Sequence, residues 1–328
     1  MRKSARLTAL PRAKHVSRQS REYRPAVGED TMTSEAGAVR RDWTNLLAAS
    51  FAITSTCIFA LIFMSGRFTG DAASPIQIMF LRYVGGLLTV TIICLVRRQS
   101  WQSIQSPYRL SQFWRVLTGA VGAVALIYGN ANMPLVDASA INLLRVVFLI
   151  VLGMIVLGER LNTMRSVGIL ICVAGAALIM VARGAFSGFG IDYLLPAGVV
   201  LVGSMFVAAE GLFIKILATT DRPLVTIVHA NVFGVLLLFV PAVLTWGSLG
   251  PVNFALLMLG PFAILGQYLT IRANELASVS VLAPLSYSSL IFAAVIGWAF
   301  FAEVPTLGVA LGAATIAAGG IVLALTRK

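Results

Sequence analysis

The chain has 328 residues, of which 58% are hydrophobic and 12% are charged, and its mean hydropathy is +0.89. Soluble domains carry about 25% charged residues, so this composition excludes a soluble globular protein and indicates a polytopic membrane protein. The net charge of +12 would suit a nucleic-acid-binding protein, but ten of the 25 Lys and Arg precede Trp43 and most others flank apolar runs. That distribution is typical of residues that orient a membrane protein, so the lipid bilayer and not nucleic acid is the expected partner.

Residues 1–43 form a polar, basic segment that is set apart from the folded part of the chain. Its first 21 residues include seven basic residues and no acidic one. A cytoplasmic tail, an organellar transit peptide and a true start at Met32 all fit this composition. A secretory signal peptide does not fit, because no apolar core follows the charges until position 45.

Apolar stretches of about 20 residues, the length that a helix needs to cross a bilayer, follow one another from residue 44 onward. Breaks rich in Gly, Pro, Ser and Asp separate them. The sequence therefore predicts an all-α integral membrane protein with ten transmembrane helices. The predicted spans are residues 44–66, 75–96, 113–131, 137–157, 163–182, 193–215, 223–246, 252–271, 278–301 and 305–325.

The positions of the basic residues predict how these spans are oriented. With the N-terminus inside, eleven Lys and Arg beyond the tail fall on the cytoplasmic side and only Arg67 and Arg183 fall outside. Cytoplasmic loops of membrane proteins carry such an excess, so we expect a bacterial inner-membrane protein with both termini in the cytoplasm. The eleven residues are Arg97, Arg98, Arg109, Arg115, Arg160, Arg165, Lys215, Arg222, Arg272, Arg327 and Lys328.

Two stretches of the chain resemble each other, which indicates a duplicated unit. A shift of 144 residues superposes Gly153 on Gly297. The same shift superposes Glu159 on Glu303, and each Glu directly precedes a new apolar span. Five spans per copy is an odd number, so the second copy must enter the membrane from the opposite side, as in the inverted repeats of alternating-access carriers. The predicted segments are a first repeat at 44–183, a linker at 184–192 and a second repeat at 193–326.

Several short motifs occur along these spans in a fixed order. They are Phe80-Leu81-Arg82, Phe113-Trp114-Arg115, Ala138 to Ala140, Leu157-Gly158-Glu159-Arg160-Leu161, Ala283-Pro284 and Phe301-Ala302-Glu303. Over about residues 44–325 this order resembles the EamA-type branch of the drug/metabolite transporter superfamily, with one departure, Val146, where the family usually has Pro. The resemblance implies a secondary transporter, a facilitator or an exchanger, for a small polar metabolite. It extends loosely to carriers of S-adenosylmethionine, riboflavin and amino acids, so the substrate stays open.

Two arginines inside predicted spans are the main candidates for binding a solute. An Arg at the centre of a spanning helix costs about 2.5–3.5 kcal/mol, so Arg82 and Arg145 should face protein or water. Counting about 1.5 Å per residue, Arg82 lies roughly 10 Å and Arg145 roughly 12 Å from the outer ends of their spans. We expect both to border one cavity and to attract the carboxylate or other anionic group of the solute. The alternative for Arg82 is a structural role beside helix-end carbonyls or an acid.

Other polar side chains within the spans complete the predicted site. Asn142 lies three residues before Arg145 and therefore on the same face of a continuous helix. Each of the remaining candidates would either line the cavity or hold two helices together. These candidates are Ser286 and Tyr287 in the corresponding helix of the second half, and Tyr128, Asn231 and Gln267.

The acidic residues are expected to have structural roles. Glu159 and Glu303 lie at the ends of spans beside water, where terminating or capping a helix is the expected role. Glu210 lies five residues before Lys215 and is expected to be its charge partner. Since no carboxylate falls clearly at mid-membrane, a facilitator or exchanger fits at least as well as proton coupling through a buried acid.

The remaining patterns do not indicate an enzyme. His229 is the only His beyond the tail, and the three Cys stand singly in apolar segments, so we expect no metal, no cofactor and no catalytic triad. Glycines such as Gly119, Gly122, Gly308 and Gly312 predict close helix packing, with a homodimer through the last span as the alternative. The alternative function is an integral membrane enzyme or a lipid-modifying or lipid-flipping protein. It would require a cluster of His, Asp or Glu at a membrane face.

Overall fold

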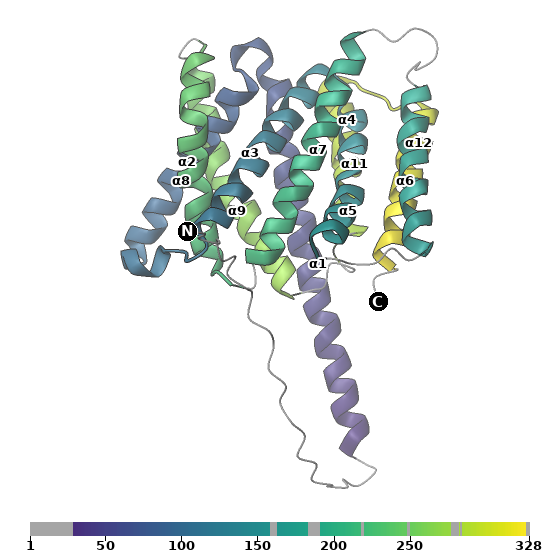
Figure 1. Ribbon diagram of the computed structural model, residues 1–328, viewed down its shortest axis with the longest axis horizontal. Coiled ribbons are helices and arrows are strands. Elements are labelled where there is room, and N and C mark those ends of the chain that lie inside the picture. Colours follow the sequence, from purple (N-terminus) through teal and green to yellow (C-terminus); the bar gives the residue numbers. More distant parts are fainter. Residues whose placement is uncertain are drawn as a thin grey trace, which may run out of the picture. The chain divides into compact units, whose positions relative to one another are not determined.

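The described elements of the chain are all helices. The chain divides into two compact units, Met1–Asp42 and Trp43–Lys328, of which the second contains the helix bundle (Figure 1). The computed structural model describes residues 29–157, 163–182, 191–217, 220–247, 250–276, 282 and 284–325. The helices are α1 (Glu29–Thr69), η1 (Gly70–Ala72), α2 (Pro75–Val96), η2 (Trp101–Ile104), α3 (Arg109–Asn132), α4 (Leu135–Asn142), α5 (Arg145–Leu157), α6 (Thr163–Ala182), α7 (Ile191–Leu217), α8 (Pro223–Leu244), α9 (Pro251–Leu276), η3 (Pro284–Tyr287), α11 (Ser288–Phe301) and α12 (Leu307–Leu325).

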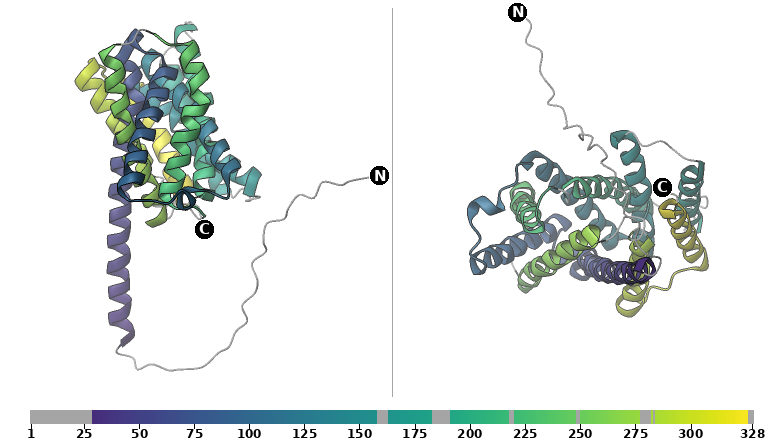
Figure 2. Two further views of the ribbon diagram at one scale, coloured as in Figure 1. Left: turned by 90° about the vertical axis from the view of Figure 1, so that its left-hand side faces the viewer. Right: turned by 90° about the horizontal axis from the view of Figure 1, so that it is seen from below.

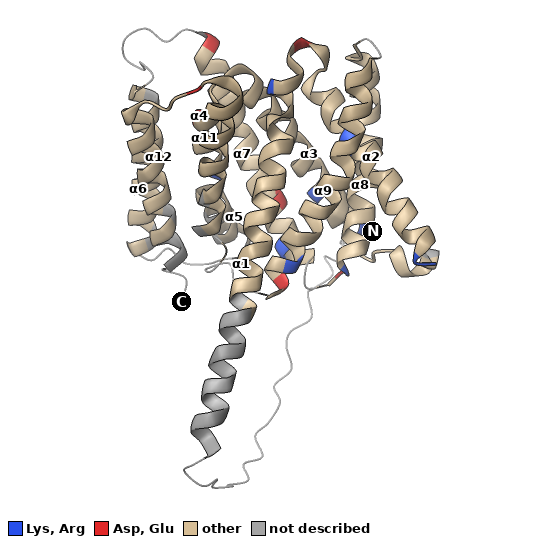
Figure 3. Ribbon diagram, turned by 180° about the vertical axis from the view of Figure 1, so that it is seen from behind, with Lys and Arg blue, Asp and Glu red and all other residues tan. Residues whose placement is uncertain are grey.

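Seven helices within the described residues are long and apolar enough to cross a membrane. They correspond to the first to fourth and the sixth to eighth predicted spans, and Figure 3 shows how sparse charged residues are along them. Three shorter apolar helices, Ser166–Ile179, Ser288–Phe301 and Leu307–Gly319, fall in the other three predicted spans. The structure thus confirms an all-helical membrane protein, and the number of ten crossing helices stays a prediction.

The helices α2 and α9 cross with their backbones in direct contact. A Cβ atom added to Gly260 would overlap the backbone of Gly85 and Gly86, and one added to Gly85 would overlap the carbonyl of Leu257. Small residues allow such an approach, and in a membrane this close van der Waals packing holds helices together. Glycine is therefore required on both sides of this crossing.

A second close contact joins α6 and α12. A Cβ on Gly312 would lie 2.8 Å from the carbonyl oxygen of Gly175, and one on Gly319 would lie 2.8 Å from the amide nitrogen of Cys172. On Gly308 it would lie 2.6 Å from the Cβ of Ala182. The close packing predicted for glycines of the last span is confirmed, with α6 as the partner.

Contacting helices often come from different predicted repeats. α6 packs on α12, α2 on α8 and α9, and α3 on α7 and α8. Figure 1 shows α6 and α12 at one side of the bundle and α2 and α8 at the other, and Figure 2 shows the same separation from below. Between these sides stand α4, α5, α7 and α11, so the interior of the bundle is bordered by helices of both repeats.

The fourth predicted span, residues 137–157, is interrupted in the structure. α4 ends at Asn142 and α5 begins at Arg145. Between them the amide of Leu144 donates to the carbonyl of Ile141, three residues back, over 3.0 Å, which is the tighter bonding of a 3₁₀ turn. The span is therefore not one continuous helix, as the sequence analysis assumed. A 3₁₀ turn still brings side chains three residues apart, such as those of Asn142 and Arg145, to the same side.

Candidate functional site

A cavity of about 420 Å³ lies inside the bundle. Its lining extends from Lys215 and Asn274, which are exposed near the ends of α7 and α9, to the buried Met64 and Asn130. Pockets that take small molecules usually measure about 300–1,000 Å³. The cavity therefore has room for a metabolite-sized solute and reaches the surface at one end.

The cavity carries more positive than negative charge. Four cationic side chains line it, Arg82, Arg115, Arg145 and Lys215, together with one carboxylate, Glu210, among the described residues. A low-dielectric wall strengthens the attraction of these groups for an opposite charge. The lining therefore favours a solute with an anionic group.

Arg82 is held in α2 against the side chain that follows it. Its guanidinium carbon lies 4.2 Å from the ring centroid of Tyr83, a cation–π contact. The side chain is 5% exposed, and its Nε has no hydrogen-bond partner within the described part of the chain. A buried guanidinium N–H without an acceptor is costly, and a solute oxygen in the cavity would supply one.

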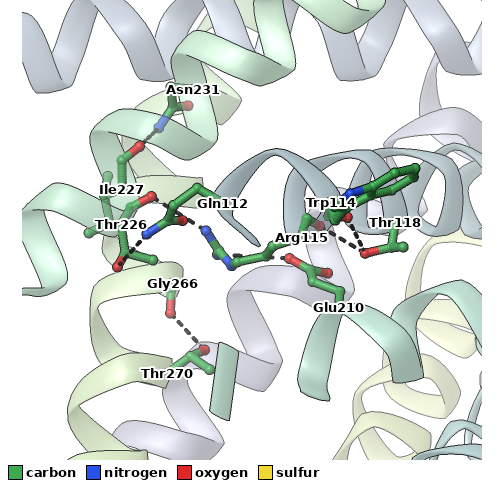
Figure 4. A network of polar contacts seen from close by, with 10 residues as sticks. All are labelled: Gln112, Trp114, Arg115, Thr118, Glu210, Thr226, Ile227, Asn231, Gly266 and Thr270. Atoms are coloured by element: carbon green, nitrogen blue, oxygen red, sulfur yellow. Dashed lines mark hydrogen bonds and ion pairs between the residues drawn. The ribbon is translucent and has the colours of Figure 1, made fainter. Parts of the chain in front are cut away.

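Arg115 and Glu210 face each other across the contact between α3 and α7 (Figure 4). Arg115 Nη2 lies 3.8 Å from Glu210 Oε1, and Arg115 Nη1 donates to the carbonyl oxygen of Thr226 over 3.4 Å. Gly119, one turn after Arg115, leaves the space that the carboxylate fills, since a Cβ there would lie 2.6 Å from Glu210 Cδ. Both side chains line the cavity, and the Glu210 side chain is the more exposed partner, at 25% against 2% for Arg115.

A polar network below Arg115 fixes the start of α3 beside the start of α8. Asp221 Oδ2 accepts hydrogen bonds from Ser106 Oγ over 2.6 Å and from Gln112 Nε2 over 2.8 Å. Gln112 Nε2 also lies 3.4 Å from Thr226 Oγ1, as Figure 4 shows. These contacts fix Thr226, whose carbonyl binds Arg115, so the position of the guanidinium is set by both helices.

Five of the eight residues predicted from sequence line this one cavity. Asn142, at the end of α4, accepts a hydrogen bond from Ser204 Oγ at 3.4 Å. Gln267 has a buried Oε1 without a hydrogen-bond partner among the described residues. The five residues are Arg82, Asn142, Arg145, Gln267 and Ser286.

Two of the other predicted residues, Asn231 and Tyr128, are not in the lining. Asn231 is 2% exposed, donates to the carbonyl of Ile227 over 2.8 Å, and packs so closely on Gly86 that a Cβ there would overlap its side chain. Tyr128 is half-buried on α3. Tyr287 ends η3, and its side chain lies outside the described part of the structure. For Asn231 the contacts are those of a residue that holds helices together.

The sequence analysis missed two charged residues of the cavity lining as site candidates. Arg115 was noted only as part of a motif, and Glu210 was assigned to Lys215, whereas the structure places its carboxylate beside Arg115. The pairing joins α3 to α7 and depends on the fold, so residue spacing does not reveal it. A local signal existed in Gly119, four residues after Arg115, which opens the helix face on which the carboxylate sits.

Comparison with known proteins assigns the first part of the chain to a family. Residues 46–181 match the EamA-like transporter family. This stretch is an EamA domain. The family resemblance drawn from the motifs is thereby confirmed. This domain supplies Arg82, Arg115, Asn142 and Arg145 to the cavity lining. Other polar and charged lining residues, such as Glu210 and Gln267, lie after residue 181 and therefore outside the matched range.

Relatives cover most of the chain. It is 28% identical over 261 residues to the pseudopaline exporter CntI of Pseudomonas aeruginosa. The aligned residues cover 77% of this chain and 87% of the exporter. It is 22% identical over 306 residues to an uncharacterized transporter of Helicobacter pylori, 86% and 96% of the two chains. A chain of known crystal structure superposes with a TM-score of 0.61 at 17% identity, over 86% of this chain and 97% of that one, and so shares the fold. The EamA domain and these relatives support a membrane transporter.

At the end of the bundle away from Lys215, an ion pair connects the EamA domain to the α11–α12 turn. Arg67 Nη2 donates to Glu303 Oε1 over 2.7 Å, and Arg67 Nη1 donates to the carbonyl of Met133 over 3.3 Å. Glu303 Oε2 accepts from the amide of Leu135, the first residue of α4, over 2.9 Å. The capping role expected for Glu303 is found, but at the start of α4. Glu159, its counterpart, lies outside the described residues.

We expect Glu303→Gln to lower the free energy of unfolding by about 2 kcal/mol. Glutamine is uncharged and has a single accepting oxygen, so it loses the ion pair with Arg67 and cannot accept from both Arg67 and the Leu135 amide as the two carboxylate oxygens do. The measurement is thermal unfolding of the purified protein in detergent. Glu275→Gln is the matched control, since Glu275 pairs with Arg272 at the exposed end of α9, where a pair contributes about 1 kcal/mol or less. Equal shifts for the two variants would contradict the capping role.

The described residues do not suggest a metal centre. Within them no three His, Cys, Asp or Glu side chains gather as ligands of one ion would. Cys57, Cys94 and Cys172 are free thiols on different parts of the bundle.

Proposed function

We propose that this protein is a secondary transporter, working by alternating access, of a small polar metabolite that carries a carboxylate or another anionic group. The observation that carries the proposal is the excess of cationic over acidic side chains in a cavity of about 420 Å³. Guanidinium groups bind carboxylates and phosphates in paired hydrogen bonds. The match to a transporter family and the similarity to an exporter support transport rather than catalysis.

The proposal includes ten crossing helices in two inverted sets of five. The shift of 144 residues found in the sequence relates Asn142 to Ser286 and Arg145 to Ser289. All four residues line the cavity, and Ser289 Oγ is buried without a hydrogen-bond partner in the described structure. Equivalent positions of two repeats that meet at one site are what inverted-repeat carriers show. The polar second-half positions would complete the solute site opposite Arg145.

We further propose export as the direction, with both termini in the cytoplasm of a bacterial inner membrane. In that orientation the exposed end of the cavity, near Lys215 and Asn274, opens to the cytoplasm, where an exporter loads its solute. The similarity to a pseudopaline exporter supports this direction. Counterflow in vesicles of known orientation tests it, because export requires the labelled solute to enter from the face that carries Lys215.

Arg145→Ala should reduce the transport rate at least about tenfold, because a lost charge-assisted contact is worth about 1.4 kcal/mol or more. Arg145→Lys keeps the positive charge and should therefore retain an intermediate rate. A thermal-stabilisation screen against a metabolite panel identifies the solute, and counterflow in proteoliposomes then measures the rate. Arg272→Ala, at an Arg that is paired at the exposed end of α9, serves as control. Undiminished counterflow by Arg145→Ala with normal membrane insertion would remove Arg145 from the site.

A further inference from the structure

The carboxylate of Glu210 occupies the place where an anionic solute would be held. It lies 3.8 Å from Arg115, and the positive charges of Arg115, Arg82 and Arg145 all act on it. Glu210 is the only carboxylic acid in the lining contributed by the described residues. The cavity thus contains one anionic group that the protein itself supplies.

Binding of a solute anion changes the surroundings of this carboxylate. The solute takes up part of the positive charge that Glu210 shares with the guanidinium groups and adds a negative charge beside it. Two carboxylates that share one site do not both stay ionised readily, and one of them takes up a proton. Glu210 stands on a partly desolvated wall, so the neutral acid is the form that permits the solute to bind.

We propose that Glu210 couples transport to protons, binding one proton for each solute anion that enters the cavity. This inference rests on the proposed function and assigns its coupling ion. In the empty site ionised Glu210 neutralises Arg115. In the loaded site a proton from cavity water forms an O–H bond on the Glu210 carboxyl group, and the solute anion takes its place at the guanidinium groups. A monoanion then moves together with one proton, so its transport is electroneutral. In the proposed outward direction it is driven by the concentration gradient of the solute and not by the inward proton gradient.

The other charged and titratable groups around Glu210 do not provide this coupling at neutral pH. Arg82 and Tyr83 face it from α2, Arg115 from α3 and Arg145 from α5, and Lys215 follows on its own helix. The ordinary pKa values of Arg, Tyr and Lys side chains all lie at about 10 or above. Histidine does not contribute to the lining in the described part of the chain. Glu210 is the group whose protonation the solute controls.

The test uses inorganic sulfate, which is a dianion at about pH 5 and at about pH 8, the two pH values compared. Carboxyl groups take up protons toward the lower of these values, and Glu210 is the one carboxylic acid that the described residues contribute to the lining. Thermal stabilisation of the full chain by sulfate, against chloride at equal ionic strength, gives the affinity at both pH values. Wild type should bind sulfate about tenfold more tightly at the lower pH. Glu210→Gln, a mimic of the neutral acid, should bind it tightly at both, and the matched control Glu275→Gln should behave as wild type.

A second measurement applies even where Glu210→Gln does not fold. Sulfate added to the wild-type protein in weakly buffered detergent solution at about pH 7 should raise the pH reading of an indicator dye by the uptake of about one proton per protein, and chloride should not. Equal pH dependence in wild type and Glu210→Gln, or sulfate binding without proton uptake, would overturn the coupling role and leave the anion cavity intact. Absence of any sulfate stabilisation would overturn the anion cavity and the coupling role together.

Discussion

Replacing Gly260 with alanine is expected to lower the free energy of unfolding by about 3 kcal/mol and to reduce the amount of folded protein in the membrane. The added Cβ would overlap the backbone of Gly85 and Gly86 at the crossing of α2 and α9. Backbone atoms cannot move aside as the tip of a side chain can, so the two helices must separate along the crossing. The close packing that stabilises their association would then be lost.

Gly198→Ala is the control for this substitution. Gly198 lies in α7, is exposed, and has no heavy atom within 4 Å of the added Cβ. Alanine there should be neutral or should stabilise the helix by up to about 1 kcal/mol. Thermal unfolding in detergent and fluorescence-detected size exclusion measure both variants. Wild-type stability in Gly260→Ala would show that α2 and α9 do not touch as described.

Arg115→Met should destabilise the protein by about 3–5 kcal/mol, because it leaves Glu210 without its charge partner in a largely apolar wall. The side chain of Arg115 is 2% exposed, and it also binds the carbonyl of Thr226. Adding Glu210→Gln to Arg115→Met should restore part of the lost stability, because the uncompensated carboxylate is then absent. A double-mutant cycle of chemical unfolding free energies measures this coupling, expected at about 0.5–3 kcal/mol.

The exposed pair of Arg272 and Glu275 supplies the comparison for this cycle. Its charges lie three residues apart at the end of α9, with side chains 42% and 26% exposed. Water and salt weaken such pairs, so Arg272→Met should change stability by about 1 kcal/mol or less. Similar losses for Arg115→Met and Arg272→Met would contradict a structural role of the ion pair between α3 and α7.

The sequence was most informative where a residue type conflicts with its surroundings. Apolar runs revealed the spans because a bilayer requires them, and Arg82 and Arg145 stood out because a guanidinium inside such a run is costly. Both arginines line the cavity. Polar neutral residues were harder to assign, since Asn231 satisfies its amide on its own helix, as membrane-helix residues commonly do.

Features that depend on contacts between helices could not be predicted from the sequence. The interruption between α4 and α5 falls at Leu143 and Leu144, without a proline or glycine to signal it. The partner of Glu210 was misassigned because Lys215 is near in sequence whereas Arg115 is near in space. Local patterns describe one helix at a time, and the charge pairing in this cavity is a property of several.

The contacts among helices have a mechanical consequence for the alternating access proposed above. α2, α3, α8 and α9 pack on one another, and so do α4, α6, α11 and α12. Each of these blocks takes members from both ends of the sequence, so a rocking motion would displace two mixed rigid bodies rather than the N-terminal half against the C-terminal half. The hinge would then follow the seam where α4 and α5 meet α7, on which Asn142, Arg145 and Glu210 all lie.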